Sequence, residues 1–134
     1  MVLVDANILI DVFSADPHWG DVAEAALLRV GNERLAINPL IYAEVSAAYS
    51  TQEKLEANLD LLELVRLELP YRAGFLAAKA FVQYRRRGGE KRSPLPDFYI
   101  GAHALSEGLS LLTRDPRRYR SYFPKVRLIH PEGP

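Results

Sequence analysis

The 134-residue sequence contains no cysteine, and this absence excludes several classes of functional site. Disulfide frameworks, thiolate zinc centres, iron–sulfur clusters and cysteine nucleophiles all require the missing side chain. No apolar run approaches the ~18–20 residues of a membrane-spanning helix, and the first residues form no basic leader. We therefore expect a cytoplasmic protein that does not act at a membrane.

The sequence also has no net charge, because 17 basic residues balance 17 acidic residues. The two signs are nevertheless segregated along the chain. Residues 1–84 carry 6 basic and 12 acidic side chains, whereas residues 85–127 carry 11 basic and 4 acidic side chains. Hydrophobic residues make up 49% of the sequence, an ordinary share for a packed globular protein. We expect one domain over residues 1–134, with a cationic C-terminal third.

Short apolar segments alternate with helical patterns along the sequence. The expected strands are residues 2–4, 35–37, 65–69, 109–113 and 126–129. The expected helices follow Asp16, Asn38 and Ser50, occupy residues 71–87, and run from Pro96 to Gly108. Strands that alternate with helices predict an α/β fold with a parallel central sheet, and the period-two pattern of 65–69 predicts a strand near its edge.

Four acidic residues occupy positions where a parallel α/β fold places ligands. Asp5 ends the first strand, Asp115 follows the fourth strand, and Asp97 begins the helix that leads into it. Glu44 lies on the apolar side of the helix after the second strand, where we expect it to be half buried. Carboxylates that converge without histidine or cysteine indicate a divalent cation, and all-oxygen ligands favour Mg²⁺ or Mn²⁺.

Each acid also has a purely structural interpretation. Asp97 is suited to cap a helix, Asp115 to form an Asp-Pro turn, and Glu44 to sit at a core boundary. Asp5 is harder to explain in this way, because it interrupts an apolar run that needs no polar residue. The residue types alone leave a shared metal site and separate structural roles equally open.

Four segments together resemble PIN-domain ribonucleases and, more narrowly, the VapC-type toxins of prokaryotic toxin–antitoxin pairs. These segments are Val-Leu-Val-Asp5-Ala-Asn7-Ile-Leu-Ile, Pro39-x-x-Tyr-Ala-Glu44-Val, Pro96-Asp97-Phe-Tyr-Ile-Gly-Ala-His-Ala and Leu-Leu-Thr113-Arg114-Asp115-Pro-x-x-Tyr119. Each motif is weak by itself, but their order and spacing over nearly the whole chain are specific.

The resemblance implies a three-layer α/β/α fold with a central parallel sheet of about five short strands. It implies an Mg²⁺- or Mn²⁺-dependent endoribonuclease that uses water to hydrolyse RNA and inhibits translation as the toxin of a type II toxin–antitoxin system. The metal-binding and catalytic residues would be Asp5, Glu44, Asp97 and Asp115, with Asn7 and Thr113 as their hydrogen-bonding partners. A cognate antitoxin and a homodimer are the implied protein partners, and the leucine- and alanine-rich segment from Leu40 to Leu62 is a candidate surface for both.

Basic and aromatic residues near the acids have two interpretations. An RNA-binding rim or a solvated helix face would each account for Arg85, Arg86, Arg87, Lys91, Arg92, Arg114, Arg117 and Arg118. Base stacking or packing at the edge of the core would each account for Tyr84, Tyr99 and Tyr119. His103 is expected to be a packed polar residue rather than a metal ligand.

Other functions are less compatible with these residues. A receiver-like signalling domain requires an aspartate at the end of the third strand, where this chain has Leu69-Pro70-Tyr71. An aspartyl phosphatase requires a second aspartate two residues after Asp5, where this chain has Asn7. A non-catalytic or differently specific PIN-fold interaction module and a metal-dependent DNA nuclease stay as alternatives.

Overall fold

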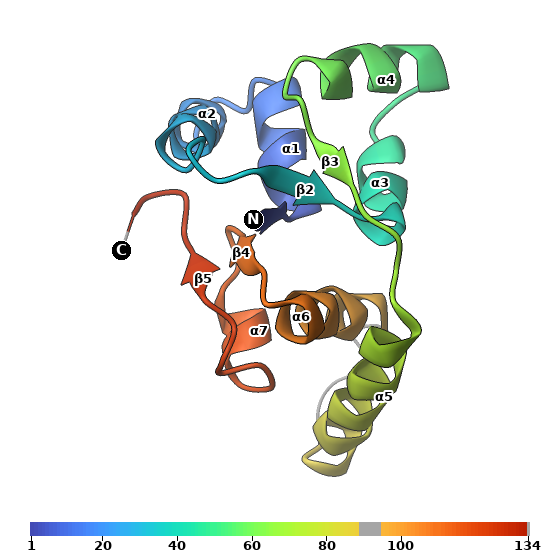
Figure 1. Ribbon diagram of the computed structural model, residues 1–134. Helices are drawn as coiled ribbons and strands as arrows, with labels where there is room; N and C mark the ends of the chain where they lie inside the picture. The colour runs from blue at the N-terminus through green and yellow to red at the C-terminus, as the bar shows by residue number, and fades with distance from the viewer. Residues whose placement is uncertain (89–94, 134) are drawn as a thin grey trace.

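Five short parallel strands form one sheet at the centre of the protein (Figure 1). The structure is a computed structural model that describes residues 1–88 and 95–133. The strands are β1 (Val2–Val4), β2 (Leu35–Ile37), β3 (Val65–Arg66), β4 (Ser110–Leu112) and β5 (Leu128–Ile129). Their order across the sheet is β3-β2-β1-β4-β5, and every neighbouring pair is parallel. The prediction of a parallel sheet of about five strands is confirmed.

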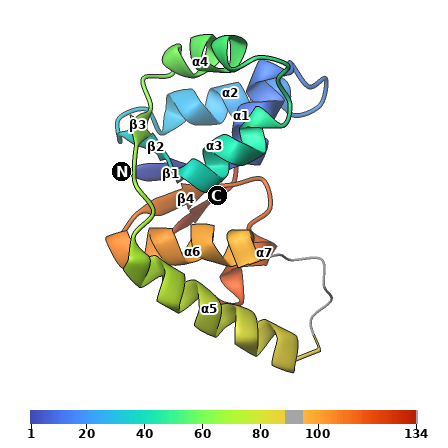
Figure 2. The ribbon, with the colours of Figure 1, turned by 90° about the vertical axis from the view of Figure 1, so that its right-hand side faces the viewer.

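Helices cover both faces of this sheet. They are α1 (Ala6–Phe13), α2 (Gly20–Arg29), α3 (Pro39–Ser46), α4 (Gln52–Asp60), α5 (Tyr71–Arg86), α6 (Leu95–Glu107) and α7 (Arg117–Arg120). Figure 2 shows α1 to α4 above the sheet and α5 and α6 below it. Right-handed crossovers require this division, because the chain moves outward from β1 to β3 and then returns to the other side of β1. The three-layer α/β/α architecture is confirmed.

Local side-chain contacts explain where several helices begin. Asn38 accepts a hydrogen bond from the Ile41 backbone N–H at 2.9 Å, so α3 begins as predicted. The cap of α4 is Thr51, which accepts the Lys54 N–H, and the predicted cap at Ser50 is wrong by one residue. The helix predicted to follow Asp16 begins only at Gly20, because the Asp16 carboxylate accepts backbone N–H groups within a preceding turn.

The sequence predictions missed two short helices and overestimated the lengths of three strands, β3, β4 and β5. Helix α1 follows β1 directly, with Asp5 as its N-cap, and α7 forms one turn after Pro116. Strand β3 spans two residues instead of the predicted 65–69, although it does lie at the sheet edge. Elements this short depend on tertiary packing more than on local propensity.

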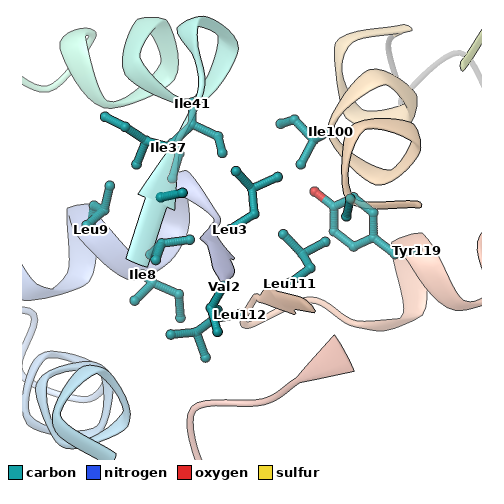
Figure 3. Packing of buried hydrophobic residues seen from close by; sticks show 14 of the residues in the cluster. Val2, Leu3, Ile8, Leu9, Ile37, Ile41, Ile100, Leu111, Leu112 and Tyr119 are labelled. Carbon is teal, nitrogen blue, oxygen red and sulfur yellow. The ribbon is translucent and has the colours of Figure 1, made fainter. Parts of the chain in front are cut away.

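The core lies on both sides of β1, whose three residues are fully buried (Figure 3). Helix α6 packs closely against the C-terminal segment through Gly101. A Cβ atom at this glycine would lie 2.5 Å from the Phe123 ring and 3.1 Å from the Tyr119 ring. This close approach fixes α6, and with it Asp97, against the segment that carries Tyr119. No helix within the described part of the chain has the length and apolarity needed to cross a membrane.

Candidate active site

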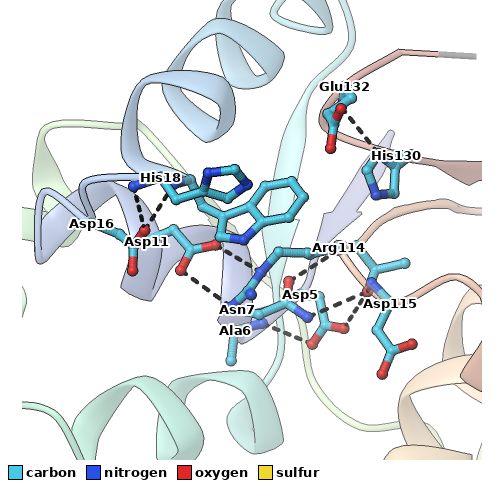
Figure 4. A network of polar contacts seen from close by, with 12 residues as sticks. Asp5, Ala6, Asn7, Asp11, Asp16, His18, Arg114, Asp115, His130 and Glu132 are labelled. Atoms are coloured by element: carbon cyan, nitrogen blue, oxygen red, sulfur yellow. Dashed lines mark hydrogen bonds and ion pairs between the residues drawn. The ribbon is translucent and has the colours of Figure 1, made fainter.

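The strand order reverses between β1 and β4, and this position is where parallel α/β sheets bind ligands. Asp5 follows β1 and Thr113 follows β4. The two strand ends are joined by a hydrogen bond of 2.9 Å from the Asp5 backbone N–H to the Leu112 carbonyl oxygen. The polar groups gathered around these ends are drawn in Figure 4.

Asp5 is a buried carboxylate with a fixed orientation. Its Oδ1 atom accepts the Ala6 N–H at 2.8 Å, and its Oδ2 atom accepts hydroxyl protons from Thr113 at 2.8 Å and Tyr119 at 3.0 Å. Burial raises the pKa of Asp5 above its ordinary value, while these three hydrogen bonds and the charge of Arg118 lower it. Burial thus disfavours the charged form of Asp5, while three donors fix the orientation of its carboxyl group.

Asn7 and Thr113 link this carboxylate to the loop that carries Asp115. The Asn7 side chain donates to the Thr113 hydroxyl oxygen at 3.5 Å and accepts the Arg114 backbone N–H at 3.2 Å. The same hydroxyl oxygen accepts the Asp115 N–H at 3.0 Å. These contacts hold the two strand ends in one arrangement. That Asn7 and Thr113 orient metal ligands stays a prediction.

Arg118 joins two of the four predicted acids. Its Nη1 atom lies 3.3 Å from Oδ2 of Asp97, and its Nη2 atom lies 3.2 Å from Oδ2 of Asp115. Asp97 is buried at the start of α6, and burial together with the charges of Asp5 and Asp115 raises its pKa, whereas Arg118 lowers it. Asp97 and Asp115 thus lie on one guanidinium, within electrostatic range of Asp5.

Glu44 adds a carboxyl group to the acidic set from α3. The residue as a whole is exposed, whereas its carboxyl group is partly buried, so the prediction of a half-buried Glu44 describes its carboxyl group. This partial burial and the charges of Asp5 and Asp97 raise its pKa to about 7. The Glu44 carboxyl group therefore lies within electrostatic range of these two acids.

The donor chemistry of this acidic set suits a divalent cation. Four carboxylates offer only oxygen atoms. Burial raises the pKa of Asp5, Glu44 and Asp97, and repulsion from other acids adds to this rise at Glu44 and Asp97. Within residues 1–88 and 95–133, however, no three Asp, Glu, His or Cys side chains are arranged to hold an ion as they stand. Two of the carboxylates are already engaged by Arg118. The residue types fit a metal, and Arg118 contacts the Oδ2 atom of each of these two carboxylates.

The predicted basic rim divides into groups with different surroundings. Arg114 is held by Asp11, with Nε 3.0 Å from Oδ2, and its guanidinium lies 5.2 Å from the Trp19 ring centre. Arg118 is held by the site carboxylates, while Arg117 is exposed beside it. The exposed C-terminal end of α5 carries Arg85, Arg86 and Arg87. Lys91 and Arg92 lie outside the described residues.

The three tyrosines considered for base stacking take part in packing. Tyr119 is 1% exposed and points its hydroxyl at Asp5, so it has no ring face for a base. Tyr84 packs against the rings of Phe98 and Tyr122. Tyr99 is partly buried and donates its hydroxyl proton to the Pro70 carbonyl oxygen at 3.0 Å. The stacking interpretation is wrong for Tyr119, and packing at the core edge describes the other two.

His103 is the packed polar residue that the sequence predicted. It is 1% exposed, and its Nδ1 atom lies 3.0 Å from the side-chain nitrogen of Asn38. Because the Asn38 oxygen accepts the Ile41 N–H, its nitrogen is the donor and Nδ1 is the acceptor. Burial lowers the pKa of His103, which is therefore a neutral structural ring.

Two parts of this region were missed by sequence reasoning. The Tyr119 hydroxyl that binds Asp5 lies four residues after Asp115, a spacing that one helical turn makes plausible in retrospect. The Asp11–Arg114 pair had a clearer signal, because Asp11 interrupts the same apolar segment as Asp5 and is 3% exposed. A buried acid in an apolar run requires a partner, whichever role it has.

This chain is similar to a known protein family and to several solved structures. The family model described as the PIN domain matches residues 2–124. VapBC2 from Rickettsia felis bound to a promoter DNA fragment is 19% identical, with a TM-score of 0.75 over 97% of this chain and 98% of that chain. VapBC-1 from nontypeable Haemophilus influenzae is 20% identical, with a TM-score of 0.73 over 98% of each chain.

A toxin–antitoxin complex from Klebsiella pneumoniae is 23% identical, with a TM-score of 0.72 over 98% of each chain. No curated protein sequence matches the chain. At these identities the solved structures establish a shared fold. The family model covers most of the chain, including all four acidic residues of the site. This protein belongs to the PIN domain family.

Proposed function

We propose that this protein is an Mg²⁺- or Mn²⁺-dependent endoribonuclease and the toxin of a type II toxin–antitoxin system, inhibiting translation by cutting RNA. One observation carries the proposal. Asp5, Asp97, Asp115 and Glu44 converge at the switch point of the sheet, and a single guanidinium offsets their charge. PIN nucleases generally use divalent metals, which suits an excess of carboxylates at this position.

In this proposal the ion is held by Asp5, Glu44, Asp97 and Asp115. Once bound, a divalent cation polarises the scissile phosphate and lowers the pKa of a water molecule, so that hydrolysis needs no protein nucleophile. The chain supplies the geometry. Thr113 and Tyr119 hold Asp5 in place, and the Thr113 hydroxyl also fixes the backbone at Asp115. Arg117 lies exposed next to Arg118, where it can meet the phosphate backbone of RNA.

The proposed partners are a cognate antitoxin and a second copy of the chain. Support for an antitoxin comes from the structural neighbours, which include a toxin–antitoxin complex. The chain also offers an apolar groove of about 510 Å³ that is lined by residues of α2 and by the segment after α4. Leu28 and Leu61 border it with exposed fractions of 77% and 75%. Large exposed leucines beside a groove suit an amphipathic helix from a partner.

The function is tested with purified, antitoxin-free protein on end-labelled RNA, both structured and single-stranded, in Mn²⁺, Mg²⁺ or chelator. Wild-type protein should give discrete cuts that require metal. Asp5→Asn and Asp97→Asn should each lower the cleavage rate more than about 100-fold, since even partners of metal ligands contribute 10–100-fold. Asp60→Asn, an exposed acid on α4, is purified in parallel and should cut like wild type.

Three results would contradict the proposal. Equal cleavage by all four proteins would identify a contaminating nuclease. Metal-dependent cutting of matched DNA with no cutting of RNA would favour the DNA nuclease alternative. If folded wild-type protein cuts neither nucleic acid and binds no Mn²⁺, the PIN fold here serves as an interaction module.

A further inference from the structure

Arg118 has a position that the nuclease proposal does not yet explain. It belongs to the single-turn helix α7, and its two terminal nitrogens each contact a different acid, Asp97 at 3.3 Å and Asp115 at 3.2 Å. A guanidinium that spans two carboxylates in this way takes the place of a bridging cation. The same two carboxylates belong to the proposed metal-binding set.

The charge of Arg118 acts on the whole acidic set. Its positive charge lowers the pKa of Asp5, Glu44 and Asp97, whereas the charges of neighbouring acids raise the pKa of Glu44 and Asp97. In return, the charges of Asp97 and Asp115 raise the pKa of Arg118 itself. Arg118 is therefore the counterion of this acidic site.

The contact is also built so that it can open. The Arg118 side chain is 40% exposed and the Asp115 side chain is 47% exposed, so the guanidinium can turn into solvent. The next residue, Tyr119, is 1% exposed and anchors the backbone through its bond to Asp5. The side chain of Arg118 can thus leave the two acids while the helix that carries it stays in place.

We propose that Arg118 and the divalent cation compete for Asp97 and Asp115, and that ion binding releases the guanidinium to hold the RNA phosphate. This inference rests on the proposed function and deepens it. A cation and a guanidinium beside the same oxygens repel each other, so the ion is bound more weakly while Arg118 stays paired. Arg118 is a positioning residue whose partner changes from carboxylate to phosphate.

The competition is tested by calorimetric titration of Mn²⁺ into metal-free protein at pH 7.5. Arg118→Gln removes the competing charge and should bind Mn²⁺ about tenfold more tightly than wild type, while Arg118→Lys should lie between them. The matched control is Arg72→Gln, which removes an equal charge and a surface pair with Glu107. Its affinity for Mn²⁺ should equal that of wild type, because Arg72 lies on α5 and pairs with none of the four acids of the proposed metal site.

The phosphate role is tested on RNA in saturating Mn²⁺. Arg118→Gln should raise KM about tenfold or more with a smaller effect on kcat, because a charge-assisted contact to phosphate is lost. Unchanged or weaker Mn²⁺ binding by Arg118→Gln, with binding lost in Asp97→Asn, would overturn the competition and leave the metal site intact. Absence of Mn²⁺ binding in every protein would instead overturn the proposed function.

Discussion

Arg114 and Arg118 lie four residues apart on this chain, and each contacts carboxylates. The two clusters differ in net charge. Arg114 meets one buried acid, Asp11, and its guanidinium also lies over the Trp19 ring. Arg118 meets two acids directly and acts on two more at a distance. The first cluster is a neutral pair, whereas the second keeps a strong excess of negative charge.

The difference separates a structural contact from a functional one. A one-to-one ion pair has no net charge, so it needs no further ion to balance it. Four carboxylates that share a single guanidinium leave charge uncompensated. Burial raises the pKa of Asp5, Glu44 and Asp97, and the charges of neighbouring acids add to this rise at Glu44 and Asp97. This electrostatic repulsion occurs at the ends of β1 and β4, where a bound cation would offset it.

The largest expected effect on stability comes from breaking the balanced pair. Arg114→Gln leaves the Asp11 carboxylate, which is 3% exposed, without its cation. Unpaired buried charges cost 3–5 kcal/mol, and because the Arg114 side chain is 36% exposed we expect a smaller loss of about 1–3 kcal/mol in the free energy of unfolding. Denaturant unfolding measures this loss.

The response to metal distinguishes the two arginines. Arg118→Gln should also lower the melting temperature of metal-free protein, but Mn²⁺ should restore it by neutralising the acids that lost their counterion. Mn²⁺ should leave the deficit of Arg114→Gln in place. Equal rescue of both variants would contradict the distinction between the clusters.

A smaller effect is expected at the hydroxyl that supports Asp5. Thr113→Val removes the donor to Asp5 and the acceptor of the Asp115 N–H at a fully buried position. The free energy of unfolding should fall by about 1–2 kcal/mol, and Thr113→Ser, which keeps the hydroxyl, should recover most of it. A valine variant as stable as wild type would show that these hydrogen bonds contribute little.

The smallest predicted effect is a pH dependence that arises from Glu44. In the unfolded chain this group loses its proton near its ordinary pKa of 4.5, whereas in the fold its pKa is about 7. Between these values the folded state binds more protons, so the stability of metal-free protein falls as pH rises from 4.5 to 7 and then levels off. The fall should be shallower in Glu44→Gln, and Mn²⁺ affinity should rise with pH through 7.

Most of the sheet and part of the acidic site follow from the sequence. The apolar segments before Asp5 and Asp115 identify β1 and β4, and their adjacency at a switch point brings the two acids together. The helices α1 and α7 were missed because they span eight and four residues, too few for a clear period. The exposure of Glu44 as a whole residue was missed because α3 buries only Ile41 and Val45.

The partners of the arginines could not be predicted. Sequence placed Arg114, Arg117 and Arg118 together as one candidate rim, because all three follow the last strand before β5. In the fold Arg114 bonds to a residue 103 positions away, and Arg118 reaches back to the start of α6. Contacts over such separations are set by how α1, α6 and α7 pack, which no local pattern encodes.

The central claim is that the excess of carboxylates around Arg118 is a divalent-cation site. The most direct measurement is a calorimetric Mn²⁺ titration of wild type, Asp97→Asn and Arg114→Gln under conditions where all three are folded. The account predicts saturable binding by wild type and Arg114→Gln and its loss in Asp97→Asn. Binding that persists unchanged in Asp97→Asn, or is absent from wild type, would contradict it.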